Sequence, residues 1–144
     1  MSKLKTAEAA AKLIPNDAVV AVNSSSGLCC PDAVLQAIGE RFDREASPKN
    51  LTTIHPIAAG DMFGTKGVDH IAKPGLLSKV IGGSYPSGPS KADPPLVWQM
   101  IAKNEIAAYN VPSGIVFDML REAAAKRPGV LTKVGMETFV DPDL

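Results

Sequence analysis

The stretch from Ala18 to Asp32, AVVAVNSSSGLCCPD, constrains the fold of this chain more than any other. It begins with an apolar, largely β-branched run that is typical of a short strand buried on both faces of a sheet. Small polar residues and Gly27 follow, and Pro31 then fits the first position of a helix, where the helix dipole favours Asp32. Open α/β sheets build ligand pockets in this way, at the carboxyl ends of their strands.

Two interpretations of this loop stay open at the level of the sequence. The loop has neither the G-x-G-x-x-G pattern nor a Walker sequence, and the early carboxylate of Asp32 would repel a phosphate. The loop is therefore either one wall of a pocket for another kind of ligand, or an ordinary strand-to-helix turn whose serines satisfy backbone groups.

The chain has 144 residues, enough for one domain with a real core, so we expect a single α/β domain over residues 1–144. Its 15 basic residues balance its 15 acidic residues, which predicts no attraction to nucleic acid or to an anionic membrane. The sequence shows no apolar run of membrane-spanning length and no secretory signal, so we expect a cytoplasmic protein.

The cysteines are adjacent, at Cys29 and Cys30, and neighbouring residues rarely bridge their sulfur atoms without strain. A catalytic thiol would need a nearby base, and His55 and His70 are distant along the chain, so small buried thiols are the favoured interpretation. Two cysteines and two scattered histidines lack the spacing of known zinc sites, and we predict no metal.

Apolar periodicity predicts that strands and helices alternate through most of the chain. We expect helices at 6–14, 31–45, 68–72, 94–104 and 115–127, strands at 18–23, 51–57, 76–81 and 106–111, and a strand-like segment within the tail, 130–144. The predicted fold class is α/β, with a mainly parallel sheet, helices on both faces and right-handed crossovers.

Two further segments are rich in glycine, which is typical of loops. Residues 58–67, AAGDMFGTKG, form either a second ligand-facing loop with Asp61 at its centre or a mobile connection. Residues 82–95, GGSYPSGPSKADPP, contain too much glycine, proline and serine for regular structure, and predict a surface loop beside a site or against a partner. The tryptophan that follows, Trp98, is expected in the core.

The last third of the chain carries a set of residues in a specific order and spacing. They are Tyr109-Asn110, Pro112, Gly114, Leu120-Arg121, Pro128-Gly129, Gly135, Thr138-Phe139 and Asp141-Pro142. Together they resemble the amino-terminal half of the family I coenzyme A transferases, the acetate, propionate and 3-oxoacid CoA-transferases. The start of the chain, with Ile14-Pro15 before the first strand, is similar as well, so the resemblance spans nearly the whole chain.

The resemblance implies a fold of two similar α/β halves, fused or made as α and β subunits, with the active site between them. It implies a reaction that moves coenzyme A from an acyl-CoA to a free short-chain carboxylate. A glutamate attacks the thioester, forms a mixed anhydride and becomes a glutamyl-CoA thioester, helped by hydrogen-bond donors aimed at the thioester oxygen. Coenzyme A is a substrate here, so no separate cofactor is expected.

By the same resemblance the nucleophile lies in the other half, and no glutamate of this chain has a glycine two residues later. We therefore expect no catalytic residue in this chain, and a β-type half as its partner in an oligomer. The residues expected to bind substrate are Ser24, Ser25, Ser26 and Gly27, which face the thioester, and Gly60, Asp61, Gly82 and Gly83, which line the cleft.

The three serines stand where the family usually has a glycine-rich loop. They would narrow the space and add hydroxyl donors, which suggests a changed acyl or carboxylate preference. They also motivate an alternative function, a non-catalytic α/β ligand-binding or interaction domain that keeps the fold. A third hypothesis, a Rossmann-type nucleotide-binding protein, lacks its glycine fingerprint.

Overall fold

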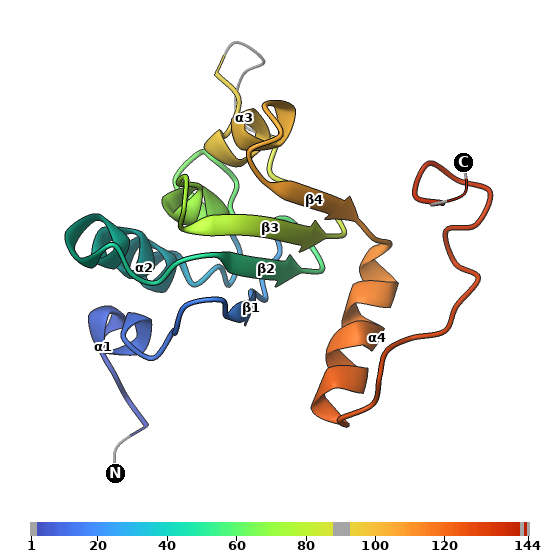
Figure 1. The fold of residues 1–144 in the computed structure, drawn as a ribbon, viewed down its shortest axis with the longest axis horizontal. Coiled ribbons are helices and arrows are strands. Elements are labelled where there is room, and N and C mark those ends of the chain that lie inside the picture. The colour runs from blue at the N-terminus through green and yellow to red at the C-terminus, as the bar shows by residue number, and fades with distance from the viewer. Residues whose placement is uncertain (1–2, 88–92, 142, 144) are drawn as a thin grey trace.

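The structure, a computed structural model, describes residues 3–87, 93–141 and 143. Its centre is a four-stranded sheet in the order β1-β2-β3-β4 (Figure 1). The strands are β1 (Val19–Ala21), β2 (Leu51–His55), β3 (Leu77–Gly82) and β4 (Ala107–Asn110). Every neighbouring pair is parallel, so the carboxyl ends of all four strands lie at one edge. The predicted parallel α/β fold is confirmed.

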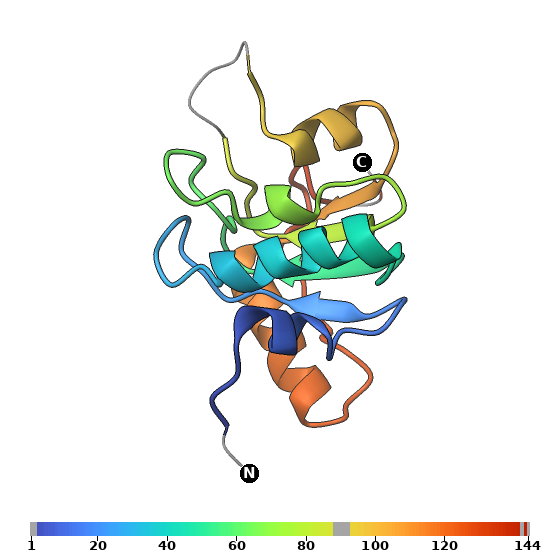
Figure 2. The ribbon, with the colours of Figure 1, turned by 90° about the vertical axis from the view of Figure 1, so that its left-hand side faces the viewer.

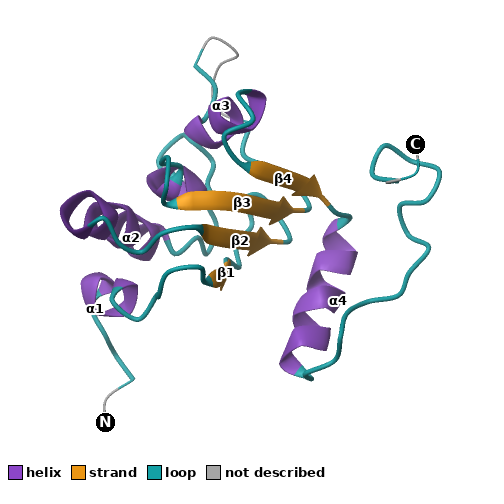
Figure 3. Cartoon of the chain, in the orientation of Figure 1, coloured by secondary structure: helices purple, strands orange, loops and turns teal. Residues whose placement is uncertain are grey.

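Helices lie on both faces of this sheet. They are α1 (Ala7–Ala11), α2 (Asp32–Glu45), the 3-10 helix η1 (Gly67–Ile71), α3 (Leu96–Ala102) and α4 (Ser113–Ala124). In Figure 2, α1 and α2 lie in front of the sheet and α4 lies behind it. Figure 3 shows the same division from the side, with α4 apart from the other helices. None of the helices in the described residues is long and apolar enough to span a membrane.

The first helix is shorter than its sequence suggests. Thr6 caps it as predicted, because its hydroxyl accepts the amide of Ala9 at 3.2 Å. The helix ends at Ala11, however, and not at Ile14. Arg41 of α2 donates to the carbonyls of Ala11 and Ile14, both at 2.9 Å, and so satisfies groups that the end of the helix leaves open.

The core lies between one face of the sheet and α2, η1 and α3. Its fully buried apolar side chains include Leu35, Ile38, Leu51, Ile71, Leu76, Val80 and Val97. From β1, Val20 and its neighbour Val22 pack against this core, but Val19 is 64% exposed. The prediction that this strand is buried on both faces is therefore wrong. The strand lies at the edge of the sheet, and β2 is its partner there.

The predicted core position of Trp98 is wrong in part. The ring is 40% exposed, and its indole nitrogen donates to the carbonyl of Pro86 at 2.6 Å. Trp98 therefore sits at the rim of the core and holds the loop before α3. Of that loop, residues 88–92 lie outside the described part of the structure, and the described remainder is irregular, as predicted.

The strand predicted in the tail is wrong as well. Residues 125–141 and 143, as described, contain no strand. Leu131 and Phe139 are 102% and 87% exposed. A strand needs a neighbour to satisfy its backbone groups, and no described strand pairs with the tail.

Candidate functional site

The loops that follow β1 and β2 are hydrogen-bonded to each other at the carboxyl edge of the sheet. Ser24 Oγ donates to the carbonyl of Ala58 at 3.2 Å, and the amide of Gly60 donates to the carbonyl of Ser26 at 3.1 Å. The structure thus brings together two groups of residues that the sequence predicted separately. Ser24 is buried, whereas Ser25 and Ser26 are exposed and can meet a ligand.

Gly27 lies directly against Asp61. A side-chain carbon on Gly27 would overlap the carboxylate and would lie 3.3 Å from the hydroxyl oxygen of Thr65. Position 27 therefore favours glycine, because the Asp61 side chain lies where a side-chain carbon would be. The loop after β2 thus limits the size of the residues in the loop after β1.

The carboxylate of Asp61 organises its own loop. One oxygen accepts the amides of Phe63, Gly64 and Thr65, at 2.9, 3.2 and 3.1 Å. These backbone donors, Phe63 and Thr65 above all, lower the pKa of Asp61, while slight burial opposes the shift. Asp61 is thus held as an anion by its neighbours, which suits a structural anchor better than a nucleophile.

Asp32 joins the start of α2 to η1. Its Oδ1 accepts the amide of Gly67 at 2.7 Å, and its Oδ2 lies 3.2 Å from His70 Nε2. Folding therefore gives His70 a carboxylate partner, although the two residues are far apart along the chain. The role of Asp32 is to fix the connection between these elements, beyond its predicted interaction with the helix dipole.

Both cysteines are free thiols, and their environments differ. Cys29 is exposed, which contradicts the interpretation of a buried thiol, and Cys30 is half-buried. Burial, with smaller effects from the carboxylates of Asp32 and Asp61, raises the pKa of Cys30 to about 11. Cys30 therefore stays protonated at neutral pH, where a nucleophile would need the thiolate. The described residues gather no group of three or more His, Cys, Asp and Glu side chains that could hold a metal ion.

The glycines at the end of β3 pack against the loop after β2. The amide of Gly83 donates to the carbonyl of His55 at 3.1 Å, and a side-chain carbon on Gly83 would overlap Ser113 and the carbonyl of Pro56. On Gly82 such a carbon would lie 2.6 Å from the His55 ring. The predicted site residues therefore lie in three neighbouring loops at one edge. That these residues contact a substrate stays a prediction.

His55 is a fully buried side chain that the sequence did not single out. Neither ring nitrogen makes a hydrogen bond of acceptable geometry to a described residue, although backbone groups of Ile57 and Ser84 lie near the ring. Burial lowers the pKa of His55, and these backbone groups oppose the shift. The imidazole is therefore neutral at physiological pH. It meets the ring of Tyr85 edge-on, at 5.4 Å between centroids.

A cavity of about 410 Å³ opens beside these aromatic rings. Tyr85 contacts Trp98 at 5.7 Å between ring centroids, and the Tyr85 hydroxyl donates to the carbonyl of Tyr109 at 2.7 Å. The cavity is lined by Gly83, Ser84, Tyr85, Trp98, Ile101, Ala108 and Asn110. Of the predicted site residues, Gly83 lines it. The sequence analysis did not predict the other lining residues as part of a site. Two aromatic residues, Tyr85 and Trp98, lie on either side of the irregular loop, and this pattern could have indicated them.

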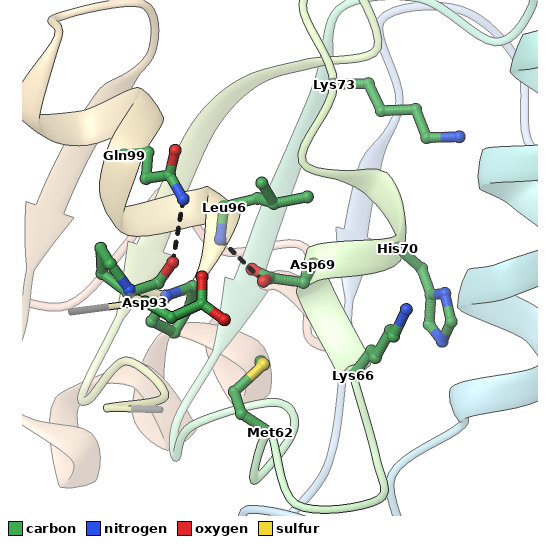
Figure 4. A pocket seen from close by; sticks show the side chains of 10 residues that line it. Met62, Lys66, Asp69, His70, Lys73, Asp93, Leu96 and Gln99 are labelled. Atoms are coloured by element: carbon green, nitrogen blue, oxygen red, sulfur yellow. Dashed lines mark hydrogen bonds between the residues drawn. The ribbon is translucent and has the colours of Figure 1, made fainter. Parts of the chain in front are cut away.

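A second cavity, of about 440 Å³, lies between η1 and the start of α3 (Figure 4). The predicted site residues do not line it. Asp69 in its wall accepts the amides of Leu96 and Val97, at 2.7 and 3.0 Å, and so caps α3. Lys73 pairs with Asp43. Asp69 and Lys73 thus serve the fold, and we place the candidate site at the carboxyl edge of the strands.

The sequence pattern of the coenzyme A transferase family matches residues 3–144. The chain therefore belongs to the coenzyme A transferase family. It is 35% identical over 144 residues to the caffeate CoA-transferase of Acetobacterium woodii, which covers 100% of this chain and 26% of that protein. It is 30% identical over 138 residues to the acetate CoA-transferase YdiF of Escherichia coli O157:H7, which covers 95% of this chain and 25% of that protein. The chain thus spans about a quarter of the length of these relatives.

Solved structures give the same assignment. The acyl-CoA transferase YdiF of Escherichia coli O157:H7, in a thioester complex with CoA, matches with a TM-score of 0.81 and 29% identity. The match covers 96% of this chain and 27% of that one. The decarboxylase AibA/AibB, at 16% identity and a TM-score of 0.61 over 86% of this chain and 44% of that one, shares the fold.

Proposed function

We propose that this chain is the α-type part of a CoA-transferase, an enzyme that moves coenzyme A between an acyl-CoA and a free carboxylate. The observation that carries the proposal is the joining of three loops at the carboxyl edge of a sheet whose chain belongs to this family. This edge is where α/β proteins bind their ligands.

The nucleophile of the reaction comes, in this proposal, from a β-type half of the enzyme. The glutamates of this chain, Glu8, Glu40, Glu45, Glu105, Glu122 and Glu137, all lie outside the three loops. Asp61, in the loop after β2, is held by three backbone amides. A chain about a quarter as long as its relatives leaves ample polypeptide to supply a glutamate.

The contribution of this chain is then a wall of the site and not the reacting group. The glutamate carboxylate attacks the thioester carbonyl, the acyl–sulfur bond breaks and CoA leaves as a thiolate. The thiolate then attacks the glutamyl carbonyl of the anhydride and releases the acyl group as a free carboxylate. The exposed hydroxyls of Ser25 and Ser26 offer hydrogen bonds to a substrate in the cleft, and Ser24 holds the loop in place.

The test replaces the aligned quarter of the Acetobacterium woodii caffeate CoA-transferase with this chain. CoA transfer from acetyl-CoA and other acyl-CoA donors to a panel of carboxylates is then measured for the chimera, the parent enzyme and the isolated chain. We expect turnover by the chimera and the parent alone. Mass spectrometry should find CoA on a glutamate outside the segment contributed by this chain.

Two outcomes would contradict the proposal. Turnover by the isolated chain, or a CoA adduct on one of its own residues, would place the chemistry here. A folded chimera that binds acetyl-CoA in calorimetric titration but does not turn over would favour the non-catalytic ligand-binding alternative.

A further inference from the structure

The backbone of Ser26 has a conformation that favours glycine. Its φ angle is 54°, in the left-handed region that costs conformational energy for a residue with a side chain. Two backbone hydrogen bonds between Ser25 and Leu28, both of 3.0 Å, close the tight turn around this residue. The carbonyl of Ser26 also accepts the amide of Gly60 at 3.1 Å. Backbone contacts of two loops therefore hold Ser26 in its strained conformation.

The side chain of Ser26 has no role in this arrangement. It is exposed, and its hydroxyl makes no hydrogen bond to a described residue. Ser24 in the same loop is different, because its buried hydroxyl donates to the carbonyl of Ala58 at 3.2 Å. A glycine at position 26 would keep the backbone hydrogen bonds and would adopt the left-handed region without strain. The fold itself therefore favours glycine here over serine.

Other residues in the left-handed region show the contrast. Asp17 and Asn50, with φ angles of 60° and 56°, are joined by a side-chain hydrogen bond of 3.1 Å. Cys29 follows the turn with a φ angle of 56°, but a thiol is a weak hydrogen-bond donor. Ser26 is thus a strained residue of this loop whose side chain can form a strong hydrogen bond outside the fold. Such strained residues cluster at sites that meet a ligand.

A negative charge lies beside this turn. The carboxylate of Asp61 stands where a side-chain carbon on Gly27, the neighbour of Ser26, would be. Asp61 makes no ion pair with a described residue, and backbone amides lower its pKa, so it is ionised at neutral pH. Lys66, further along the loop of Asp61, lines the separate cavity between η1 and α3 (Figure 4). A ligand with a second negative charge at Ser26 is therefore repelled, whereas an uncharged oxygen can pair with the hydroxyl.

We propose that Ser26 is a specificity-determining residue, whose hydroxyl hydrogen-bonds an uncharged oxygen on the acyl group of the acyl-CoA. The inference rests on the proposed function and adds to it the class of acyl group. A hydroxyacyl group carries such an oxygen, and it can both donate to a serine hydroxyl and accept from it. An alkyl group leaves the hydroxyl without this bond, and the acyl group of a dicarboxylic acid meets the charge of Asp61. The order of preference is therefore hydroxyacyl, alkyl and then dicarboxylic.

The test uses acyl donors of four carbons in the chimera described above, with acetate as the acceptor. The donors are butyryl-CoA, succinyl-CoA and the two thioesters of butyrate with a hydroxyl at carbon 2 or carbon 3. We expect kcat/KM to be at least about threefold higher for one of the hydroxybutyryl donors than for butyryl-CoA, the value of one hydrogen bond. Ser26→Gly and Ser26→Ala should both bring this ratio close to one.

The charge of Asp61 is tested with the same donors. Asp61→Asn keeps an oxygen for the three backbone amides of its loop and removes the negative charge. The ratio of kcat/KM for succinyl-CoA to that for butyryl-CoA should rise at least about threefold in this variant, because a repulsion is removed. An unchanged ratio would show that the carboxylate does not face the acyl group.

Stability separates this role of Ser26 from a structural one. Ser26→Gly should raise the melting temperature of the chimera by at least about 1 °C, because glycine relieves the strain at a positive φ angle. Ser26→Ala keeps the strain and should bring no such rise. The matched control is Ala46→Gly at the end of α2, where φ is 51°. It should raise the melting temperature in the same way and leave the donor ratios unchanged.

The outcomes that overturn the inference are distinct from those that overturn the proposed function. A loss of stability in Ser26→Gly would show that the side chain serves the fold, and turnover without a preference between hydroxybutyryl and butyryl donors would refute the inference alone. A chimera that binds acyl-CoA without turnover would refute the proposed function. The same ratios are then measured as dissociation constants by calorimetric titration, and equal values would refute the inference too. An insoluble chimera, or one that binds no acyl-CoA, would overturn both.

Discussion

Gly27 and Asp61 lie in contact across two loops, so close that a side-chain carbon on the glycine would overlap the carboxylate. Asp61 cannot move away without loss, because three backbone amides of its own loop hold it. The contact therefore couples the loop after β1 to the loop after β2.

The first prediction follows from this contact. Gly27→Ala should destabilise the protein by about 1–3 kcal/mol, because the methyl group forces a well-held carboxylate out of place. Thermal unfolding of the purified protein measures the change. The matched control is Gly64→Ala in the same loop as Asp61, where an added carbon would meet no atom within 4 Å. Equal losses for the two variants would show that the contact is not tight.

The two thiols should differ in reactivity. Because the pKa of Cys30 is raised to about 11, only about a thousandth of this thiol is ionised at pH 8, and alkylation should be slow. Cys29 is exposed and should react first. Iodoacetamide labelling followed by peptide mass spectrometry measures both rates, and the rate at Cys30 should rise about tenfold per pH unit up to pH 11. Preferential labelling of Cys30 at neutral pH would contradict its burial.

Stability should depend on pH through His55. Its pKa in the folded protein lies below that of the unfolded chain, so as the pH falls below about 6.5 the unfolded state binds a proton first. Folding stability is then lost, by up to about 1.4 kcal/mol per pH unit. His55→Phe keeps the aromatic contact with Tyr85 and removes this loss. Denaturant unfolding between pH 7 and pH 5 should show a flatter profile for the variant, and parallel profiles would count against a neutral buried imidazole.

The hydroxyl group of Thr53 in β2 should not contribute to the stability of the folded protein. The side-chain oxygen of Thr53 is buried and makes no hydrogen bond to a described residue, so Thr53→Val should be neutral or stabilising by up to about 1 kcal/mol. The comparison is Ser78→Ala, which removes a hydrogen bond of 3.1 Å to the carbonyl of Leu51 and should cost about 1 kcal/mol. Denaturant midpoints of the two variants test the difference. A destabilised Thr53→Val protein would reveal a partner for the hydroxyl.

The order of strands and helices follows from local features of the sequence. Apolar side chains at helical or strand spacing indicate the kind of element, and Pro56 directly follows the last residue of β2. Alternation of the two kinds of element then favours a parallel sheet, and a parallel sheet places the loops after its strands at one edge. This arrangement places the residues Ser24, Gly60 and Gly83, which the family resemblance had grouped, at the same edge of the sheet.

The contacts of the site were decided by tertiary structure. Whether Asp61 faces a ligand or its own backbone depends on the conformation of a short loop, and no periodicity encodes it. The meeting of His55, Tyr85 and Trp98 depends on the register of β2 and β3 and on the packing of α3. Such contacts join residues far apart in the chain, so local pattern cannot predict them.

Strand β1 shows most clearly which properties follow from the sequence and which follow from the tertiary structure. The sequence by itself determined that residues 19–22 form a strand suited to burial, because β-branched side chains favour extended backbone and apolar surface leaves water. Only the tertiary structure decided that this strand is an edge with Val19 exposed, because burial depends on what lies beside a segment as well as on what the segment is.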